Sequence, residues 1–246
     1  MPRALLFDLF GTVVHFKPQV PTIEVAGSAW RSTMGWLRET AEREVPHVPF
    51  EELLPALMQV TEEIVRERPP DYLEVPSRER FRRALLRVGI AGEEASVVAE
   101  RLSLAHMAHL ASMTVLPPAH MALLDDFARR YRLALVSNFD HGPTARRVLS
   151  DHRISAFFPT TVISAEFGRR KPHPAIFAAA LRGAGVSAGD ALFIGDSIGD
   201  DVVGAQRAGV PVVWLNAKAA PLPPDTPAPH HMIARLTDLP AVLDRT

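Results

Sequence analysis

The stretch ALLFDLFGTVVHF, residues 4–16, carries a short apolar run that ends in an aspartate and a Gly-Thr turn. The run over residues 4–9 is too short for a helix, so it predicts a buried β-strand. Asp8 would then stand at the end of that strand. Two positions further on, at a spacing where a second carboxylate often takes part in chemistry, the residue is Phe10. The role of an aromatic ring at that position is the central question of this sequence.

Strands and helices alternate along the second half of the chain. Apolar runs predict strands at 132–138, 160–166, 190–196 and 210–215, and the segments between them predict helices. Such alternation is typical of βαβ units, which build a parallel sheet. The strand at 4–9 completes this sheet. The expected fold class is therefore α/β, with a Rossmann-like parallel sheet as the core.

The segment between the first strand and Pro117 has a different pattern. Apolar residues at helical spacing, with charges between them, predict helices at 22–44, 49–68, 77–89 and 93–113. No strand is predicted in this segment. We therefore predict an α/β core made of residues 1–16 and 114–246, and an inserted all-helical domain made of residues 17–113. Within the core, the proline-rich segment 219–231 is expected to form an irregular surface loop.

The composition narrows the function classes. The chain has 246 residues, of which 47% are apolar and 22% charged, and its formal net charge is −1. This balance offers no electrostatic basis for binding nucleic acid or an anionic membrane surface, and no apolar run reaches the roughly 18 residues of a membrane span. Cysteine is absent, which excludes disulfides and thiolate chemistry. We expect a cytoplasmic protein that acts on a small molecule, and the oligomeric state stays open.

Polar residues follow four of the predicted strands. They are Asp8, then Ser137 and Asn138, then Glu166 with Lys171 beyond it, then Asp196 and Ser197. The carboxyl ends of parallel strands share one edge of the sheet, where ligands of such folds bind. One polar residue after a strand is usually part of a turn or a helix cap. Four such strand ends in one chain instead predict a site at this edge.

These residue types suit phosphoryl chemistry. Asp8, held by a buried strand, could act as a nucleophile. Asp196 and the pair Asp200-Asp201 offer hard oxygen ligands that suit Mg²⁺. Lys171, one of only three lysines, adds a compact positive charge. Neutral hydrogen bonds and a close backbone approach to a phosphate would come from Gly11, Thr12, Ser137, Asn138 and Ser197.

Four segments resemble, in order and at compatible spacing, the motifs of the haloacid dehalogenase-like hydrolase superfamily. They are DLFGT at 8–12, similar to D-x-D-x-T; LVSNFD at 135–140, with its strand-terminal serine; RRKPHPAIF at 169–177, similar to the K-P-x-P-x-I-F of the branch with an insert after the first motif; and GDSIGDDVVGAQRAG at 195–209. The resemblance covers nearly the whole core. It implies that the inserted helical domain is a cap that closes over the site and selects the substrate.

The same resemblance assigns roles to the site residues. It implies that Asp8 attacks phosphorus to give an aspartyl-phosphate, with Lys171 and Ser137 as further catalytic residues. It also implies a Mg²⁺ ion held by Asp8, Asp196, Asp201 and the main-chain carbonyl of Phe10. Asp201 is preferred to Asp200 as the metal ligand, although the shorter family spacing would choose Asp200. The expected substrate is a small phosphorylated molecule.

Phe10 departs from the family pattern. Family phosphatases have an aspartate there that protonates the leaving group and then activates water, and such general acid–base catalysis is typically worth about 10²–10⁴ in rate. We therefore expect a poor phosphatase for alkyl esters that prefers a good leaving group. His15 and His141 are the nearest substitutes in sequence, although each fits a solvent-exposed loop histidine. Phe10 itself could pack as a plug against the cap.

Two other functions remain open. The 2-haloacid dehalogenases of this superfamily have an aromatic residue at the position of Phe10, because halide leaves without protonation, and they use an arginine for which Arg31 is the first candidate. They lack the aspartate that stands here as Asp196 and need no Mg²⁺, which makes this function the second choice. The third is a catalytically weak protein that binds a phosphorylated metabolite or a partner. Phosphonate cleavage would need a cap lysine, and the insert has only Lys17, at its edge.

Overall fold

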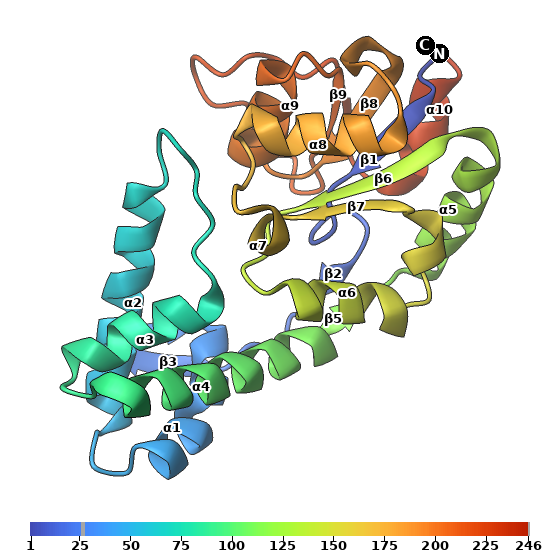
Figure 1. The fold of residues 1–246 in the computed structure, drawn as a ribbon. Helices are drawn as coiled ribbons and strands as arrows, with labels where there is room; N and C mark the ends of the chain where they lie inside the picture. The colour runs from blue at the N-terminus through green and yellow to red at the C-terminus, as the bar shows by residue number, and fades with distance from the viewer. Residues whose placement is uncertain (26–27, 246) are drawn as a thin grey trace. The chain divides into compact units, whose positions relative to one another are not determined.

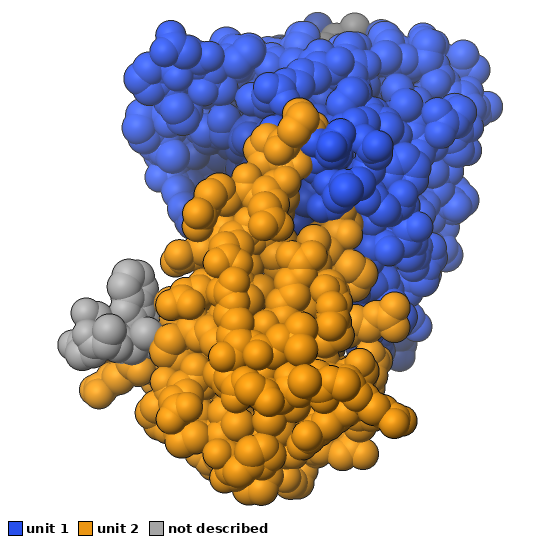
Figure 2. Space-filling view, turned by 60° about the vertical axis from the view of Figure 1, so that its left-hand side comes forward, with its two compact units in different colours: residues 1–16, 71–73, 115–246 blue, residues 17–70, 74–114 orange. Residues whose placement is uncertain are grey.

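The computed structural model describes residues 1–25 and 28–245. The chain forms two compact units, coloured blue and orange in Figure 2. We call the first the core unit; it consists of Met1–Phe16, Asp71–Leu73 and Val115–Thr246. We call the second the helical unit; it consists of Lys17–Pro70 and Glu74–Thr114. No helix in the described part of the chain is long and apolar enough to cross a membrane.

A six-stranded parallel sheet forms the centre of the core unit, in the order β10-β9-β8-β1-β6-β7 (Figure 1). The strands are β1 (Ala4–Phe7), β6 (Arg132–Ser137), β7 (Thr160–Ile163), β8 (Ala191–Gly195), β9 (Val212–Leu215) and β10 (His231–Ile233). β1 lies in the middle, with Phe7 opposite Leu135 of β6 and Ile194 of β8. The predicted α/β fold with a parallel, Rossmann-like sheet is confirmed.

Helices cover both faces of this sheet, which explains why β1 is apolar along its whole length. The helical elements of the core unit are α5 (Pro118–Arg130), α6 (Gly142–Asp151), η2 (Ser155–Phe157), α7 (Ser164–Phe167), α8 (Pro174–Ala184), η3 (Ala188–Asp190), η4 (Ile198–Val202), α9 (Val203–Arg207), η5 (Leu236–Asp238) and α10 (Leu239–Leu243). Leu6 belongs to the apolar cluster formed with α8 and α9. Phe7, on the other face, stacks on Phe127 of α5 with 6.4 Å between the ring centroids.

Two core segments differ from their predicted structure. The predicted surface loop at 219–231 runs into β10, and His231 pairs with Val213 of β9. A three-residue edge strand behind a proline-rich stretch has no alternation long enough to detect. The predicted strand at 160–166 ends at Ile163, where the short helix α7 begins.

The helical unit packs its helices around an apolar cluster of its own. Its helical elements are η1 (Thr33–Leu37), α1 (Arg38–Glu44), α2 (Phe50–Glu67), α3 (Ser77–Arg87) and α4 (Gly92–Ser112). Leu57 of α2, Phe81 of α3 and Leu102 of α4 are almost fully buried in this cluster. The predicted helices that correspond to α2, α3 and α4 are therefore confirmed.

The predicted helix at 22–44 is wrong over its first part. The chain there forms an antiparallel pair of strands, β3 (Thr22–Val25) and β4 (Ser28–Arg31). In β3, Ile23 is buried while Thr22 and Glu24 are exposed, which is the period-two alternation of a strand. The β-branched Thr22 and Ile23 also favour an extended backbone. The insert is therefore not all-helical. A further two-stranded sheet joins β2 (His15–Phe16) to β5 (Thr114–Val115).

Candidate active site

Three carboxylates gather at the carboxyl edge of the sheet. Asp8 directly follows β1, Asp196 directly follows β8, and Asp201 lies in the turn η4 beyond it. One carboxylate oxygen of each residue lies within 4.8 Å of those of the other two. Among the residues that the structure describes, this is the one cluster of three acidic or histidine side chains close enough to hold a metal ion.

The ammonium group of Lys171 lies between two of these carboxylates, and its side chain is only 1% exposed. Its Nζ donates to Asp8 Oδ1 at 2.6 Å and to the Val136 carbonyl at 2.8 Å. It also forms an ion pair with Asp201 Oδ1 at 2.7 Å. Burial disfavours the ammonium form, but Asp201 and Asp8 outweigh burial and raise the pKa of Lys171 above its usual value. Lys171 therefore stays charged and holds the Asp8 carboxylate in one orientation.

The loop that carries Lys171 is held by Asn138, the residue after β6. Asn138 Oδ1 accepts a hydrogen bond from the Lys171 main-chain nitrogen at 2.7 Å. Its Nδ2 donates to the Lys171 carbonyl at 3.0 Å and to Asp200 Oδ2 at 3.1 Å. Both amide hydrogens of Asn138 are used within the protein, so its side chain positions the loop that carries Lys171. The sequence had suggested a contact between Asn138 and the substrate.

Asp201, and not Asp200, belongs to the carboxylate cluster. Asp201 is 1% exposed and accepts a hydrogen bond from the Ser197 main-chain nitrogen at 2.9 Å, whereas Asp200 faces Asn138. η4 is a π-helical turn, whose extra residue rotates the side chains that follow Ser197, and such turns are frequent at functional sites. The Ser197 hydroxyl, predicted to bind substrate, caps this turn by accepting a hydrogen bond from the Asp200 main-chain nitrogen at 3.3 Å.

Two glycines let these loops approach one another closely. Gly11 has φ +94°, in the left-handed region that favours glycine, and a Cβ there would lie 2.5 Å from Asp196 Oδ2. A Cβ at Gly195 would collide with the Asp201 carboxylate. Gly11, predicted to approach the phosphate, therefore makes room for the Asp196 carboxylate.

Two buried hydroxyl groups complete this edge of the sheet. Thr12 and Ser137 are fully buried, and in the described part of the chain neither Thr12 Oγ1 nor Ser137 Oγ has a hydrogen-bond partner. A buried polar group without a partner costs about 1–3 kcal/mol. Such groups in native proteins call for an explanation, commonly a ligand or a water that they face. A phosphate group, rich in acceptor oxygens, matches two such donors.

Negative charge is in excess at this edge. Three carboxylates face one ammonium group, which leaves two uncompensated negative charges when all four groups are ionised. Burial, then the charge of Asp201, raises the pKa of Asp196 to about 6. Burial also raises the pKa of Asp201 to about 7, against the opposing effect of Lys171. A divalent cation with oxygen ligands would relieve this excess, so the residues present fit a Mg²⁺ ion.

The ring of Phe10 packs between two other phenylalanines. Its centroid lies 5.2 Å from that of Phe16, with 8° between the ring planes, and 4.6 Å from that of Phe139, with 28° between the planes. Both neighbours belong to the core unit. The sequence had suggested instead that Phe10 packs against the cap. We call Phe139, Phe10 and Phe16 the aromatic stack.

The two histidines suggested as substitutes for the missing acid have structural partners. His15 packs edge-on against His120, with 5.4 Å between the ring centroids, and burial, followed by His120, lowers the pKa of His15. His141 caps α6, because its Nδ1 accepts a hydrogen bond from the Thr144 main-chain nitrogen at 3.3 Å. Within residues 1–25 and 28–245, neither imidazole hydrogen-bonds to Asp8, whose side chain is paired with Lys171.

The remaining charged candidates also have partners away from the carboxylate cluster. Glu166 makes two hydrogen bonds with the Arg146 guanidinium, each of 2.7 Å, so its carboxylate is already paired. Arg31 and Lys17 both belong to the helical unit. Arg31 donates there to the Pro18 carbonyl, and Lys17 donates to the Ser112 carbonyl.

Sequence reasoning missed the role of Trp214, in the buried strand β9. Its Nε1 donates to the Asp196 carbonyl at 3.0 Å, which fixes the main chain beside one of the three carboxylates. A tryptophan late in an apolar strand gives no sequence signal of this role, because the contact depends on β8 and β9 being neighbours in the sheet.

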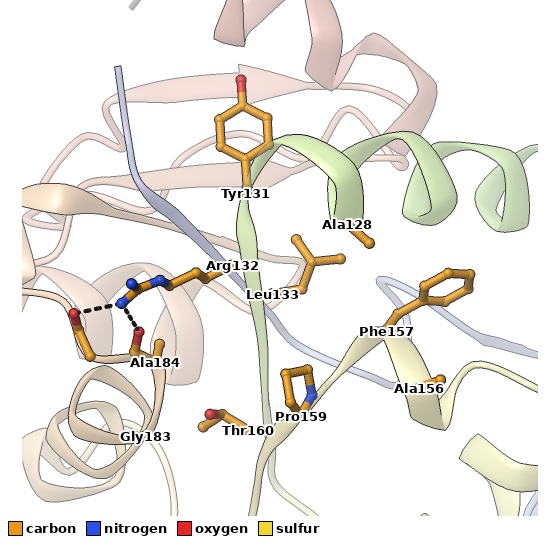
Figure 3. Close-up of a pocket in the computed structure, with 11 residues that line it drawn as sticks. Ala128, Tyr131, Arg132, Leu133, Ala156, Phe157, Pro159, Thr160, Gly183 and Ala184 are labelled. Atoms are coloured by element: carbon orange, nitrogen blue, oxygen red, sulfur yellow. Dashed lines mark hydrogen bonds between the residues drawn. The ribbon is translucent and has the colours of Figure 1, made fainter.

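A cavity of about 620 Å³ lies at the opposite, amino-terminal end of the sheet (Figure 3). Its lining includes Arg132 and Thr160, the first residues of β6 and β7. In Figure 3 the Arg132 guanidinium turns toward the end of α8, where it donates to the carbonyls of Ala184 and Gly185 at 2.9 Å each. This cavity contains none of the three clustered carboxylates.

The arrangement of strand ends, carboxylates and lysine agrees with a comparison against protein families. A family model described as haloacid dehalogenase-like hydrolase matches residues 2–209. The chain belongs to this hydrolase family. The matched range contains Asp8, Ser137, Lys171, Asp196 and Asp201.

Relatives of this haloacid dehalogenase-like hydrolase include phosphatases. Human N-acylneuraminate-9-phosphatase is 31% identical over 123 residues, which are 50% of this chain and 49% of that protein, so the match spans about half the length of that relative. The glyceraldehyde 3-phosphate phosphatase of Pyrococcus abyssi is 29% identical over 217 residues, which are 87% of this chain and 82% of that protein.

Structures similar to this haloacid dehalogenase-like hydrolase include a dehalogenase. The 2-haloacid dehalogenase from Pseudomonas syringae pv. Tomato DC3000 has a TM-score of 0.74 and 26% identity, covering 100% of this chain and 99% of that chain. The Bacillus subtilis HAD-hydrolase YfnB, bound to magnesium, has a TM-score of 0.65 and 19% identity, covering 99% of each chain. At that lower identity the likeness shows the fold alone.

Proposed function

We propose that this hydrolase is a Mg²⁺-dependent phosphatase in which Asp8 attacks the phosphorus of a small phosphorylated molecule. The observation that carries the proposal is the excess of carboxylate over ammonium charge beside two buried hydroxyls. A site for a haloacid would not require three clustered carboxylates, whereas a site for Mg²⁺ and phosphate would.

The first step uses groups of the chain that are already held in place. Lys171 fixes the Asp8 carboxylate through the 2.6 Å hydrogen bond and offsets negative charge on it and on the incoming phosphoryl group. One Asp8 oxygen forms a bond to phosphorus, and the bond from phosphorus to the leaving oxygen breaks. Thr12 and Ser137 would donate their free hydroxyl hydrogens to phosphoryl oxygens.

The metal-binding residues in this proposal are Asp8, Asp196, Asp201 and the main-chain carbonyl of Phe10. A bound Mg²⁺ ion would supply electrostatic stabilisation of the phosphoryl group. Gly11 makes room for the Asp196 carboxylate, and Trp214 holds the main chain of Asp196. The Ser197 main-chain nitrogen holds the Asp201 carboxylate. In the second step water attacks the aspartyl-phosphate, the bond between phosphorus and Asp8 breaks, and inorganic phosphate leaves.

Phe10 leaves both proton transfers without a protein group. An alkyl leaving group would depart as a strongly basic alkoxide, so its phosphate esters should react more slowly, by about the 10²–10⁴ that general acid–base catalysis supplies. An acyl or aryl leaving group departs as a stabilised anion and needs no proton. The substrate is therefore expected to carry a good leaving group.

A substrate comparison tests the proposal. Acetyl phosphate, glycerol 1-phosphate and L-2-chloropropionate are each incubated with the purified protein, with Mg²⁺ and with a chelator, beside the Asp8→Asn variant. We expect Mg²⁺-dependent release of phosphate from acetyl phosphate, much slower release from glycerol 1-phosphate, and no reaction of the variant. Metal-independent chloride release would overturn the proposal, and so would tight Mg²⁺ binding without any turnover, which is the outcome expected of a binding protein.

Dehalogenation is the second candidate, favoured by one observation. Phe10 is aromatic, which suits a leaving halide that takes no proton, and the similar P. syringae structure is a 2-haloacid dehalogenase. In that function Asp8 would attack carbon, halide would leave, and water would release the 2-hydroxyacid. The carboxylates of Asp196 and Asp201 would then have no cation to bind, which is why we place this function second.

A further inference from the structure

Two of the loops that form the candidate site each carry a phenylalanine two positions along the sequence from a predicted site residue. Phe10 comes two residues after Asp8, at the end of β1, and Phe139 comes two residues after Ser137, at the end of β6. β1 and β6 are neighbours in the sheet, so the two rings meet, 4.6 Å apart at their centroids. The aromatic stack therefore begins beside the nucleophile proposed above.

The third ring reaches the stack through a tight turn. The main-chain nitrogen of Gly11 donates to the Val14 carbonyl at 2.7 Å, and Phe10 and Val14 form an isolated β-bridge, so the chain turns back beside Phe10. Phe16 then lies almost parallel to Phe10 and is 42% exposed. A large apolar ring with that exposure, stacked on the ring that comes two residues after Asp8, offers a flat surface to a ligand.

The chemistry of the site favours the same kind of ligand. Without a protein acid at position 10, the leaving group has to accept the electron pair of the broken bond unaided. A phenol oxygen can do so because its ring delocalises the charge, whereas an alkyl oxygen cannot. The ring that makes the oxygen a good leaving group is also the part that would stack on a phenylalanine.

We propose that the aromatic stack selects aryl phosphate monoesters, with Phe16 and Phe139 as specificity-determining residues. This rests on the phosphatase function proposed above. The Asp8 oxygen bonds to phosphorus while the bond between phosphorus and the aryl oxygen breaks, and the electron pair leaves on that oxygen as a phenolate. Water then releases inorganic phosphate from Asp8, and its protons pass to solvent and phosphate. Phe10, the middle ring, holds the two outer rings in place.

The test compares two substrates that both leave without a proton. Phenyl phosphate carries the ring and acetyl phosphate does not, and kcat/KM is measured for both with Mg²⁺ present. The variants are Phe16→Leu and Phe139→Leu, which keep apolar bulk but lose the flat ring, and Phe16→Tyr, which keeps the ring. Phe157→Leu is the matched control, because Phe157 is a half-buried phenylalanine in η2, before the amino-terminal end of β7.

A ring-binding role predicts a change in the ratio of the two kcat/KM values. We expect the phenyl phosphate to acetyl phosphate ratio to fall roughly three- to tenfold in Phe16→Leu and Phe139→Leu, as the loss of one stacking contact implies. It should be retained in Phe16→Tyr and in Phe157→Leu. A merely structural loss would lower both values together and leave the ratio unchanged.

The outcomes separate the two proposals. If acetyl phosphate is hydrolysed and the ratio does not fall in either leucine variant, the stack has no role in selection and the phosphatase function still stands. If the wild-type protein hydrolyses neither substrate, the phosphatase function fails and the selection proposal fails with it. Phe16 is 42% exposed, so its substitution should leave the fold intact, and the thermal unfolding midpoint of each variant checks this.

Discussion

The core unit buries an ion cluster, whereas the helical unit buries a cluster of apolar side chains and has ion pairs that are exposed to solvent. In the core unit, Asp8, Lys171 and Asp201 are each at most 7% exposed. In the helical unit, pairs such as Arg38 with Glu51 stand in solvent. Removing charges from water is costly, so evolution has little reason to bury them where packing alone suffices. The difference indicates that the core unit is organised for chemistry and the helical unit for packing.

The lysines allow the sharpest test of this comparison. Lys171→Met leaves the Asp8 and Asp201 carboxylates facing each other without their ammonium group, so we expect a loss of about 3–5 kcal/mol in the free energy of unfolding. Lys17→Met, at an exposed lysine of the helical unit, should change it by no more than about 0.5 kcal/mol. Urea denaturation of both variants measures the difference. Equal losses would mean that the ion cluster contributes nothing particular to the fold.

Phe10→Asp would place a carboxylate two residues after Asp8, in addition to the three clustered carboxylates, and restore a possible general acid. We expect kcat/KM for glycerol 1-phosphate to rise by about 10²-fold, the lower end of the range for general acid–base catalysis. The leaving group of acetyl phosphate needs no proton, so kcat/KM for acetyl phosphate, which reports the attack of Asp8 on phosphorus, should not rise. Steady-state assays with the two substrates measure both effects. An unchanged rate with glycerol 1-phosphate would contradict the account of what Phe10 removes.

His106 is a polar exception inside the packed helical unit. It is 3% exposed, its Nε2 lies 2.9 Å from Thr33 Oγ1, and it packs edge-on against Phe81. Burial, followed by the charges of Arg80 and His109, lowers its pKa from 6.5 to about 3. The folded state therefore favours the neutral imidazole. Its contribution to stability is complete above pH 6.5 and is lost as the pH falls from there toward 3.

This lowered pKa predicts that the free energy of unfolding depends on pH through a residue of the helical unit. The free energy of unfolding should fall by about 2 kcal/mol between pH 7 and pH 5 through His106 alone. His106→Leu should lose that part of the dependence, while His47→Asn, at an exposed histidine, should keep it. Urea denaturation at the two pH values gives the comparison. If His106→Leu shows the same pH dependence as the wild-type protein, then His106 is not the group responsible.

Only a small effect is expected at a surface ion pair. Arg87 of α3 pairs with Glu63 of α2, and their side chains are 36% and 40% exposed. Such pairs are screened by water and contribute about 0–1 kcal/mol. Arg87→Ala should therefore alter the free energy of unfolding by less than about 1 kcal/mol, measured at low and at high salt. A loss comparable with that of Lys171→Met would remove the contrast between the two units.

The parts of the fold that the sequence predicted are those specified by local pattern. The alternation of apolar strands with amphipathic helices predicted the parallel sheet, since each βαβ unit carries its own signal. The pair β3 and β4 was missed because its strands have four residues each, and charges and apolar residues there also fit a helical period. β10 was missed because its three residues are too few to show alternation, and it is identified as a strand by its pairing with β9.

In the candidate site, too, the sequence predicted some features and missed others. The strand-end positions of Asp8, Ser137 and Asp196 follow from the topology and were predicted. The sequence favoured Asp201, although the shorter family spacing would choose Asp200, and in the structure it is Asp201, in the π-helical turn η4, that reaches Lys171. The contact of Trp214 with Asp196 likewise depends on the order of the strands.

By itself the sequence determined the identity of the chemical groups and the edge of the sheet at which they stand, because residue type and the position of each group at the end of its strand can be read along the chain. Only the tertiary structure decided which groups touch. It placed Lys171 between Asp8 and Asp201, left the hydroxyls of Thr12 and Ser137 without partners in the described residues, and packed Phe10 into a stack with Phe16 and Phe139. Such contacts depend on turns and on neighbouring strands, and a linear pattern carries no record of either.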